Sequence, residues 1–226
     1  MPPCPARVWL TRHAETATPM LFHGYESDVG LSDLGRRQAL AASGWFRDKS
    51  LTAVVSSGMA RAVATAAPTA QVCGVPHTVE FGLHERKVGA LCGVEFSMTE
   101  GPWAETVARW SAGDTAYTTP GAESFDDVKA RVLAAWGNVV AAHPDGDVLV
   151  AAHGVVCKVL LLSLLPGWDA TGWVKLGRVA NLSVTELVPH EGCWRAASLL
   201  RVPPPVADLS NGEPTGIGHP KVRSEA

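Results

Sequence analysis

Residues 7–13 read Arg-Val-Trp-Leu-Thr-Arg-His and residues 147–153 read Asp-Val-Leu-Val-Ala-Ala-His, so two apolar runs each end on a histidine. Short apolar runs of this kind are typical of buried strands. Ligands of open α/β sheets bind beyond the carboxyl ends of the strands, and His13 and His153 can therefore face one crevice. The two runs predict an α/β fold with a ligand site at this edge of its sheet.

Further strand-like and helix-like segments alternate with these two runs. The expected strands cover residues 52–57, 76–81, 182–188 and 194–200, the last two being edge strands joined by a turn at Glu191-Gly192. The expected helices cover residues 32–49, 59–71, 124–142 and 155–165. This alternation is the pattern of βα units on a mainly parallel central sheet.

The ends of the chain differ in composition from its centre. We expect an N-terminal extension at residues 1–5, one domain at residues 6–202 and a flexible tail at residues 203–226. The tail is rich in proline and glycine, and its few apolar residues offset little of the entropy that ordering would cost.

Composition excludes several classes of partner. The 226 residues include 19 basic and 22 acidic side chains, and the formal net charge of −3 favours neither a nucleic-acid nor a membrane partner. The five cysteines lack the paired spacing of a zinc site or a disulfide framework, so we expect free thiols. We find no secretory signal pattern, and residues 155–165 are too short to span a bilayer, so we expect a cytoplasmic protein. No pattern predicts the oligomeric state.

Two arginines and a histidine at predicted strand ends and turns suit phosphoryl transfer. Arginine forks match the oxygens of a phosphate with paired, charge-assisted hydrogen bonds, and Arg12 and Arg61 are candidates for this clamp. A neutral imidazole with one protonated ring nitrogen has a lone pair on the other. His13 is therefore the candidate nucleophile.

The remaining candidates would handle the proton and the phosphoryl charge. Glu85, in a loop punctuated by glycine, is the candidate acid that protonates the leaving oxygen. His153 would donate a hydrogen bond to the phosphoryl oxygens, and Gly154 would start a helix whose N-terminal amides favour anions. This chemistry requires no metal and no cofactor.

Each residue alone also has a structural interpretation. A histidine at a strand end is commonly a hydrogen-bonded structural residue, and Arg61 could be a solvated helix residue. Glu85 could be a surface charge paired with Lys87. Their joint placement favours a functional site.

Residues 10–16, Leu-Thr-Arg-His-Ala-Glu-Thr, resemble the RHG signature of the histidine phosphatase superfamily, which includes the cofactor-dependent phosphoglycerate mutases. Residues 56–66, 83–93 and 148–154 resemble further blocks of that family in the same order. The resemblance extends from residue 6 to about residue 200. It implies a three-layer α/β/α sandwich of the phosphoglycerate mutase-like type.

The resemblance also implies roles at the matching positions. Arg61 corresponds to the second phosphate arginine, Glu85 to the proton donor and His153 to the second active-site histidine. Residues 31–39, and residues 120–125 with Arg131, match less specific blocks.

The chain departs from the family pattern at two positions. Ala14 stands where the signature has glycine, which adds one methyl group near the phosphate pocket. Pro19 stands where many members have an asparagine that binds phosphate, so that ligand is absent. Residues 22–28 resemble a following stretch of the family with a shortened loop.

These observations favour a metal-independent phosphatase that hydrolyses a small-molecule phosphomonoester through a phosphohistidine intermediate. A cofactor-dependent phosphoglycerate mutase is one alternative, although the mutases carry a longer helical insertion between the positions of Glu85 and His153. A phosphate-binding module with weak catalysis is the other. Trp103 and Trp110 either line a substrate lid within residues 94–120 or simply pack on the helix they share.

Overall fold

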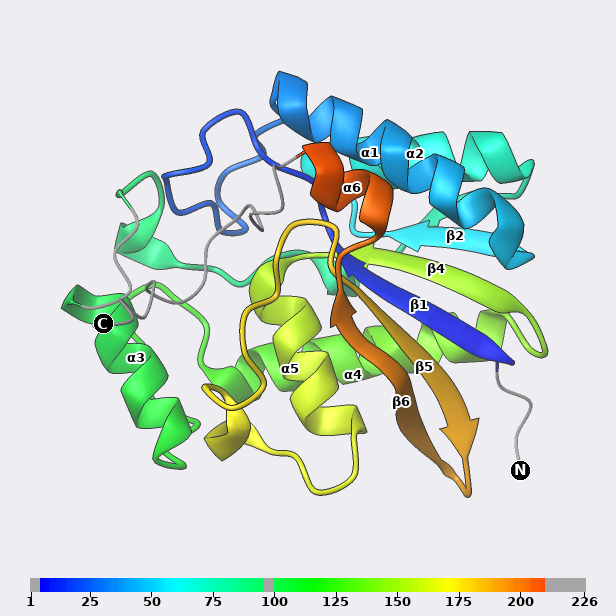
Figure 1. Cartoon of the computed structure of the whole chain (residues 1–226). Helices are drawn as coiled ribbons and strands as arrows, with labels where there is room; N and C mark the ends of the chain where they lie inside the picture. The colour runs from blue at the N-terminus through cyan, green and yellow to red at the C-terminus, as the bar shows by residue number, and fades with distance from the viewer. Residues whose placement is uncertain (1–4, 96–99, 210–226) are drawn as a thin grey trace, which may run out of the picture.

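The computed structural model describes residues 5–95 and 100–209. They form one six-stranded sheet with the strand order β3-β2-β4-β1-β5-β6 (Figure 1). The strands are β1 (Arg7–Arg12), β2 (Ala53–Ser56), β3 (His77–Val79), β4 (Asp147–Ala152), β5 (Val184–His190) and β6 (Cys193–Arg201). Strands β1 to β4 are parallel, and β5 is antiparallel to both β1 and β6. The predicted α/β fold with a mainly parallel sheet is confirmed.

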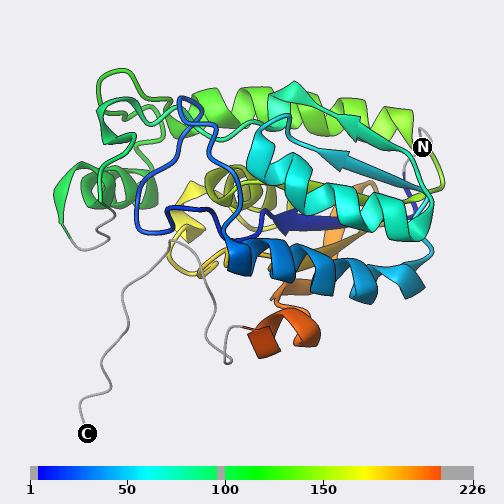
Figure 2. The same cartoon turned by 90° about the horizontal axis from the view of Figure 1, so that it is seen from above.

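Successive residues of the central strands point to opposite faces of the sheet and enter two different apolar clusters. Trp9 and Val54 join the cluster formed with α1, α2 and α6, whereas Val8 and Val55 join the cluster formed with α4 and α5. These helices are α1 (Asp33–Phe46), α2 (Ala60–Cys73), α4 (Phe125–Ala142), α5 (Gly154–Leu164) and α6 (Pro204–Leu209). Figures 1 and 2 show the two sets on opposite faces, so the three-layer sandwich is confirmed.

The helix ends follow local capping chemistry. Ser32 Oγ accepts a hydrogen bond from the Gly35 N–H at 2.9 Å and caps α1, which ends at Phe46 before a 3₁₀ turn. Ser124 and Asp127 form a reciprocal capping box at the start of α4. Gly74, with φ of 65°, ends α2 in the left-handed conformation that glycine adopts without strain.

Two strand predictions need correction. The strand expected at residues 76–81 is limited to His77–Val79, because the Glu80 carboxylate caps a 3₁₀ turn at Phe81–Leu83. The strand expected at residues 182–188 is no edge strand, since β5 pairs with β1 on one side and β6 on the other. A segment's position within a sheet depends on long-range pairing, which its local pattern does not encode.

The flexible tail expected from residue 203 also differs from the structure. Residues Pro204–Leu209 form α6, which lies beside α1 in Figure 1. Val206 is only 1% exposed and belongs to the cluster that contains Phe46 of α1. Val206 thus packs this short helix against α1, and residues 210–226 lie outside the described part of the chain.

We expect the Val206→Ala variant to lower the free energy of unfolding by about 2 kcal/mol, because it removes two buried methyl groups and leaves a cavity under α6. Urea titration followed by far-UV circular dichroism measures the change. Val174→Ala is the matched control, since Val174 is 56% exposed. Equal effects of the two variants would contradict the docking of α6.

Within the described residues, the structure contains no helix with the length and apolarity needed to cross a membrane.

Candidate active site

The two histidines of the sequence prediction lie side by side at the carboxyl edge of the sheet. The His13 N–H donates to the Ala152 carbonyl at 2.9 Å, which continues the pairing of β1 with β4 by one residue. The rings of His13 and His153 have centroids 5.2 Å apart, and both side chains are buried. The parallel pairing of their strands therefore brings the two imidazoles together.

One hydrogen bond fixes the orientation of the His13 ring. Its Nδ1 lies 2.7 Å from the Ala14 carbonyl oxygen, and because a carbonyl only accepts, Nδ1 carries the proton. Burial lowers the pKa of His13 well below its usual value, and the positive charges of Arg12 and Arg61 lower it further. The ring is thus neutral near pH 7, with a lone pair on Nε2.

The backbone around His13 is held from two sides. The Asn181 side-chain amide donates to the His13 carbonyl at 2.8 Å. The Ala14 N–H donates to Thr65 Oγ1 at 2.9 Å, and the Ala14 methyl group is fully buried in the α1–α2 cluster. The methyl group added by Ala14 therefore packs in apolar surroundings. Asn181 was missed by sequence reasoning because it lies in a loop outside the recognised motifs.

His153 adopts the opposite tautomer. Its Nδ1 accepts a hydrogen bond from Arg61 Nε at 3.2 Å, so the neutral ring carries its proton on Nε2 and donates to Ser57 Oγ at 2.8 Å. Burial, followed by the charges of Arg61 and His13, lowers the pKa of His153 well below its usual value. His153 is therefore a neutral donor beside a neutral His13.

Arg61, in the first turn of α2, is fully buried and its guanidinium is held by main-chain carbonyls. Its Nη1 donates to Ser27 O at 2.7 Å, and its Nη2 donates to His23 O and Gly24 O at 3.3 Å. Residues 22–28, the stretch that resembles the family with a shortened loop, thus supply the main-chain carbonyls that hold this arginine. Neutral carbonyls orient the guanidinium without neutralising its charge.

Arg12 also lies near the two histidines, and after the larger effect of burial its charge contributes to the lowered pKa of both. Its Nη1 donates to the Val179 carbonyl at 2.9 Å. Burial lowers the pKa of Arg12 to about 10, and the nearby Glu85 carboxylate opposes that shift. Arg12 remains a full cation at neutral pH, and both predicted arginines lie near the paired histidines.

Glu85 approaches the same site from the loop after the 3₁₀ turn at Phe81–Leu83. Its Oε1 accepts from the Arg86 N–H at 2.8 Å, and its Oε2 accepts from the Val155 N–H at 3.4 Å. Val155 follows Gly154 in the first turn of α5, which begins at Gly154 as predicted. The Arg12 side chain packs against Gly154, where a Cβ would lie 3.5 Å from Arg12 Nε.

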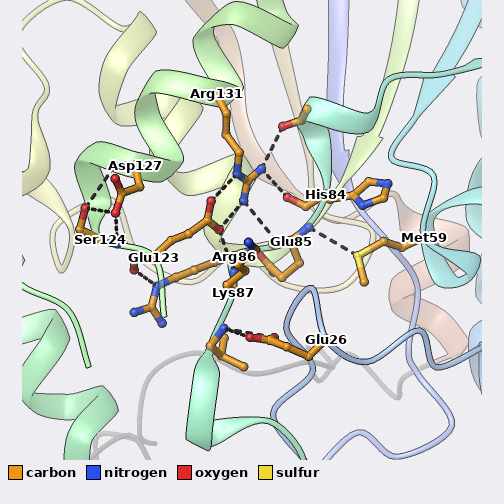
Figure 3. Close-up of polar contacts among 12 residues, drawn as sticks. Glu26, Met59, His84, Glu85, Arg86, Lys87, Glu123, Ser124, Asp127 and Arg131 are labelled. Atoms are coloured by element: carbon orange, nitrogen blue, oxygen red, sulfur yellow. Dashed lines mark hydrogen bonds and ion pairs between the residues drawn. The ribbon is translucent and has the colours of Figure 1, made fainter. Parts of the chain in front are cut away.

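The loop that carries Glu85 is fixed by Arg131 of α4 (Figure 3). Arg131 donates to the carbonyls of Gly82, His84 and Glu85, at distances of 2.9, 2.7 and 3.2 Å. Its Nε also pairs with Glu123 Oε1 at 2.7 Å. Arg131 matched a family block in the sequence, but its local pattern gave no indication that it holds this loop.

Two carboxylates hold the far side of the loop, as Figure 3 shows. Glu123 Oε2 accepts from the Lys87 N–H at 2.8 Å, and Glu26 accepts from the amides of Val88 and Gly89 at 3.0 and 2.9 Å. Glu26 was missed because nothing in the sequence relates it to residues 62 and 63 positions away. Together these contacts leave the Glu85 loop little freedom.

Arg86 connects the loop to the region expected to form a lid. Its guanidinium lies over the rings of Trp103 and Trp110, 5.5 and 5.2 Å from their centroids. Both tryptophans belong to α3 (Gly101–Ser111) and are buried in the apolar core. The structure therefore favours the packing interpretation of these residues over a role in lining a lid.

We expect Glu123→Gln to destabilise the protein by about 1–2 kcal/mol at pH 7, since the partly buried pair with Arg131 is lost. Burial acts to raise the pKa of Glu123, but hydrogen bonds from Arg131 and the Lys87 amide lower it below its ordinary value overall. A depressed folded-state pKa stabilises the protein above the unfolded-state pKa of about 4.5, and this contribution is lost as pH falls through the folded value. The difference in unfolding free energy should therefore shrink below about pH 4.

Urea titrations at several pH values measure this difference. Asp114→Asn is the matched control, because it breaks an exposed pair with Arg109 and should change stability by at most about 0.5 kcal/mol. A pH-independent effect of Glu123→Gln would contradict the assignment.

The fold and this site define a class of α/β protein in which paired neutral histidines, two buried arginines and a glutamate surround the carboxyl edge of the sheet. The family model described as the histidine phosphatase superfamily (branch 1) matches residues 8–200. The chain belongs to this superfamily.

Named relatives are of two kinds. The chain is 33% identical to glucosyl-3-phosphoglycerate phosphatase of Mycolicibacterium vanbaalenii, covering 72% of this chain and 75% of that protein. It is 29% identical to the probable phosphoglycerate mutase GpmB of Salmonella typhi, covering 84% and 88%. It also spans about half the length of mycobacterial relatives such as the bifunctional protein Rv2228c of Mycobacterium tuberculosis.

Among solved structures, mycobacterial glucosyl-3-phosphoglycerate phosphatase Rv2419c in complex with VO3 superposes with a TM-score of 0.76. The sequence identity is 29%, and the match covers 88% of this chain and all of that one. The same phosphatase has also been solved with inorganic phosphate. That phosphatase thus binds both phosphate and vanadate.

Proposed function

We propose that this chain is a metal-independent phosphatase that hydrolyses a small-molecule phosphomonoester through a phosphohistidine intermediate. The observation that carries the proposal is the neutral His13, whose Nε2 is unprotonated and whose ring lies close enough to buried Arg12 and Arg61 to be affected by their charges. A nucleophile needs its lone pair, and a phosphoryl dianion needs compensating positive charge. Catalytic roles for His13, Arg12, Arg61, Glu85 and His153, and a phosphate-binding role for Gly154, are part of the proposal.

The reaction proceeds in two steps, transfer of the phosphoryl group to His13 and then hydrolysis of the phosphohistidine. In the first, His13 Nε2 bonds to phosphorus, the ester P–O bond breaks, and Glu85 in its carboxylic acid form protonates the leaving oxygen. In the second, the oxygen of a water molecule bonds to phosphorus while the Glu85 carboxylate takes a proton from that water. The Nε2–P bond breaks, its electron pair returns to His13, and inorganic phosphate leaves. The Nδ1–H of His13 stays bonded to the Ala14 carbonyl throughout.

Three groups compensate the charge on the equatorial oxygens. Arg12 and Arg61 provide planar forks that match a phosphoryl group, and carbonyls of the chain pre-orient both. His153 provides a neutral N–H donor from Nε2, which donates to Ser57 Oγ in this structure. The positive charges of the two arginines compensate the negative charge of the phosphoryl group in this mechanism.

We prefer the phosphatase hypothesis to the mutase hypothesis on two grounds. A relative and a similar structure are both named as phosphatases that act on glucosyl-3-phosphoglycerate. Between Glu85 and His153, α3 and α4 are the only α-helices that the described residues form, besides one 3₁₀ turn and strand β4. A longer insertion of the mutase kind would help to retain a phosphorylated intermediate, and a more open site admits water to the phosphohistidine.

The test is an assay of purified protein with an aryl phosphate and a panel of phosphorylated metabolites, in which inorganic phosphate release is measured. We expect one equivalent of inorganic phosphate for each equivalent of phenol that is released from the aryl ester. Isomerisation of phosphoglycerate that 2,3-bisphosphoglycerate stimulates, without net phosphate release, would establish the mutase alternative. Vanadate binding without any turnover would establish the phosphate-binding module.

A further inference from the structure

Arg178 is a cation near the site that the proposed mechanism does not use. It lies in the loop before β5, directly before Val179, whose carbonyl accepts from Arg12 Nη1 at 2.9 Å. Three residues after it, Asn181 donates to the His13 carbonyl at 2.8 Å. The loop that carries Arg178 therefore contacts both Arg12 and the main chain of His13.

The Arg178 guanidinium has no acidic partner within residues 5–95 and 100–209. Its side chain is half-buried, and its Nε is buried with no hydrogen-bond partner among those residues. Its charge lies close enough to Arg12 to contribute to the lowered pKa of Arg12, after the larger effect of burial. A second guanidinium near Arg12 adds positive charge beside the site and so favours the binding of a further anionic group.

The loop is anchored, so Arg178 is more than a freely moving surface side chain. Lys158 of α5 donates from Nζ to the Gly177 carbonyl at 2.7 Å, and that ammonium lies 4.7 Å from the centre of the Trp173 ring. Lys158 is 5% exposed. The main chain on both sides of Arg178 is therefore tied to buried groups, through Gly177 and Val179.

We propose that Arg178 is a specificity-determining residue that binds a second anionic group of the substrate, a carboxylate or a second phosphate. The proposal rests on the proposed function and narrows its substrate class to acidic phosphomonoesters. The transferred phosphoryl group engages Arg12 and Arg61. Arg178, close to Arg12, provides a third guanidinium of the geometry that carboxylates and phosphates match.

The first test measures binding without turnover, by calorimetry on His13→Ala and on the double variant that adds Arg178→Gln. Two ligand pairs differ by a carboxylate, namely 2-phosphoglycolate against ethyl phosphate and 3-phosphoglycerate against glycerol 3-phosphate. Fructose 1,6-bisphosphate against fructose 6-phosphate tests a second phosphate. We expect Arg178→Gln to reduce the affinity ratio that favours the more acidic ligand at least about tenfold in at least one pair. This change corresponds to the loss of one charge-assisted hydrogen bond.

The second test uses turnover in the otherwise unchanged chain. The ratio of kcat/KM for the acidic ester to that for its matched partner should fall at least about tenfold in Arg178→Gln and be partly restored in Arg178→Lys. Lys175→Gln is the matched control, because the Lys175 ammonium lies over Trp168 instead. It should leave the ratio unchanged.

The outcomes separate the two proposals. The role of Arg178 would be overturned if Arg178→Gln left the preference unchanged for every pair, or lowered the affinity for both ligands of each pair equally. Either result would leave the proposed phosphatase activity unaffected. Failure of the unmodified protein to hydrolyse any ester would overturn the proposed function. The binding measurements would still decide the role of Arg178.

Discussion

Replacing His13 by alanine is expected to lower kcat by at least about 10⁴-fold and to prevent formation of a phosphorylated protein. The reason lies in the two tautomers. His13 has its free lone pair on Nε2, whereas the His153 Nδ1 lone pair accepts from Arg61 and its Nε2 carries a proton. His153 therefore does not substitute for the missing nucleophile, although Arg12 and Arg61 remain to bind phosphate.

Rapid-quench labelling with a ³²P-labelled ester measures the intermediate directly. The unmodified protein should give an adduct that is labile in acid and stable in base, and His13→Ala should give none. His190→Ala is the matched control, since the His190 side chain is exposed at the end of β5. Residual hydrolysis by His13→Ala near the rate of the unmodified protein, or an adduct located on another residue, would refute the mechanism.

The sequence predicted the edge of the sheet that carries the candidate site, because local patterns encode it. Apolar runs that end on a histidine place His13 and His153 at strand ends, and parallel pairing of β1 with β4 brings their rings to a centroid separation of 5.2 Å. Arg61 follows from the turn after β2, which pairs with the same β4. One pattern repeated on neighbouring strands thus predicts most of the candidate site.

The supporting residues were not predictable by the same reasoning. Glu26 and Arg131 bind main-chain amides and carbonyls of the Glu85 loop, and a main-chain partner leaves no trace in the sequence. The interior place of β5 and the docking of α6 have a similar origin. Each depends on a contact between distant segments, whereas periodicity and capping report only on neighbours along the chain.

The Glu85→Gln variant provides the second large effect, because Glu85 is expected to serve first as an acid and then as a base. We expect kcat for alkyl phosphates to fall by about 10²–10⁴-fold, the usual contribution of a positioned proton donor. The glutamine keeps a carbonyl oxygen that can accept from the Arg86 N–H, so the loop geometry should survive. The fall in kcat should therefore come from the loss of proton transfer, because the Arg131 contacts to the loop remain intact.

Leaving groups of different basicity distinguish this role from a merely structural one. 2,4-Dinitrophenolate needs no proton in order to leave, so Glu85→Gln should release about one equivalent of it in a fast burst. The second step would then be slow, because water has lost its base, and phosphohistidine should accumulate. Glu191→Gln, at an 85% exposed side chain, is the matched control and should show no such burst. An equal loss of rate for alkyl and dinitrophenyl esters, without a burst, would remove Glu85 from proton transfer and leave it a structural carboxylate between Arg86 and α5.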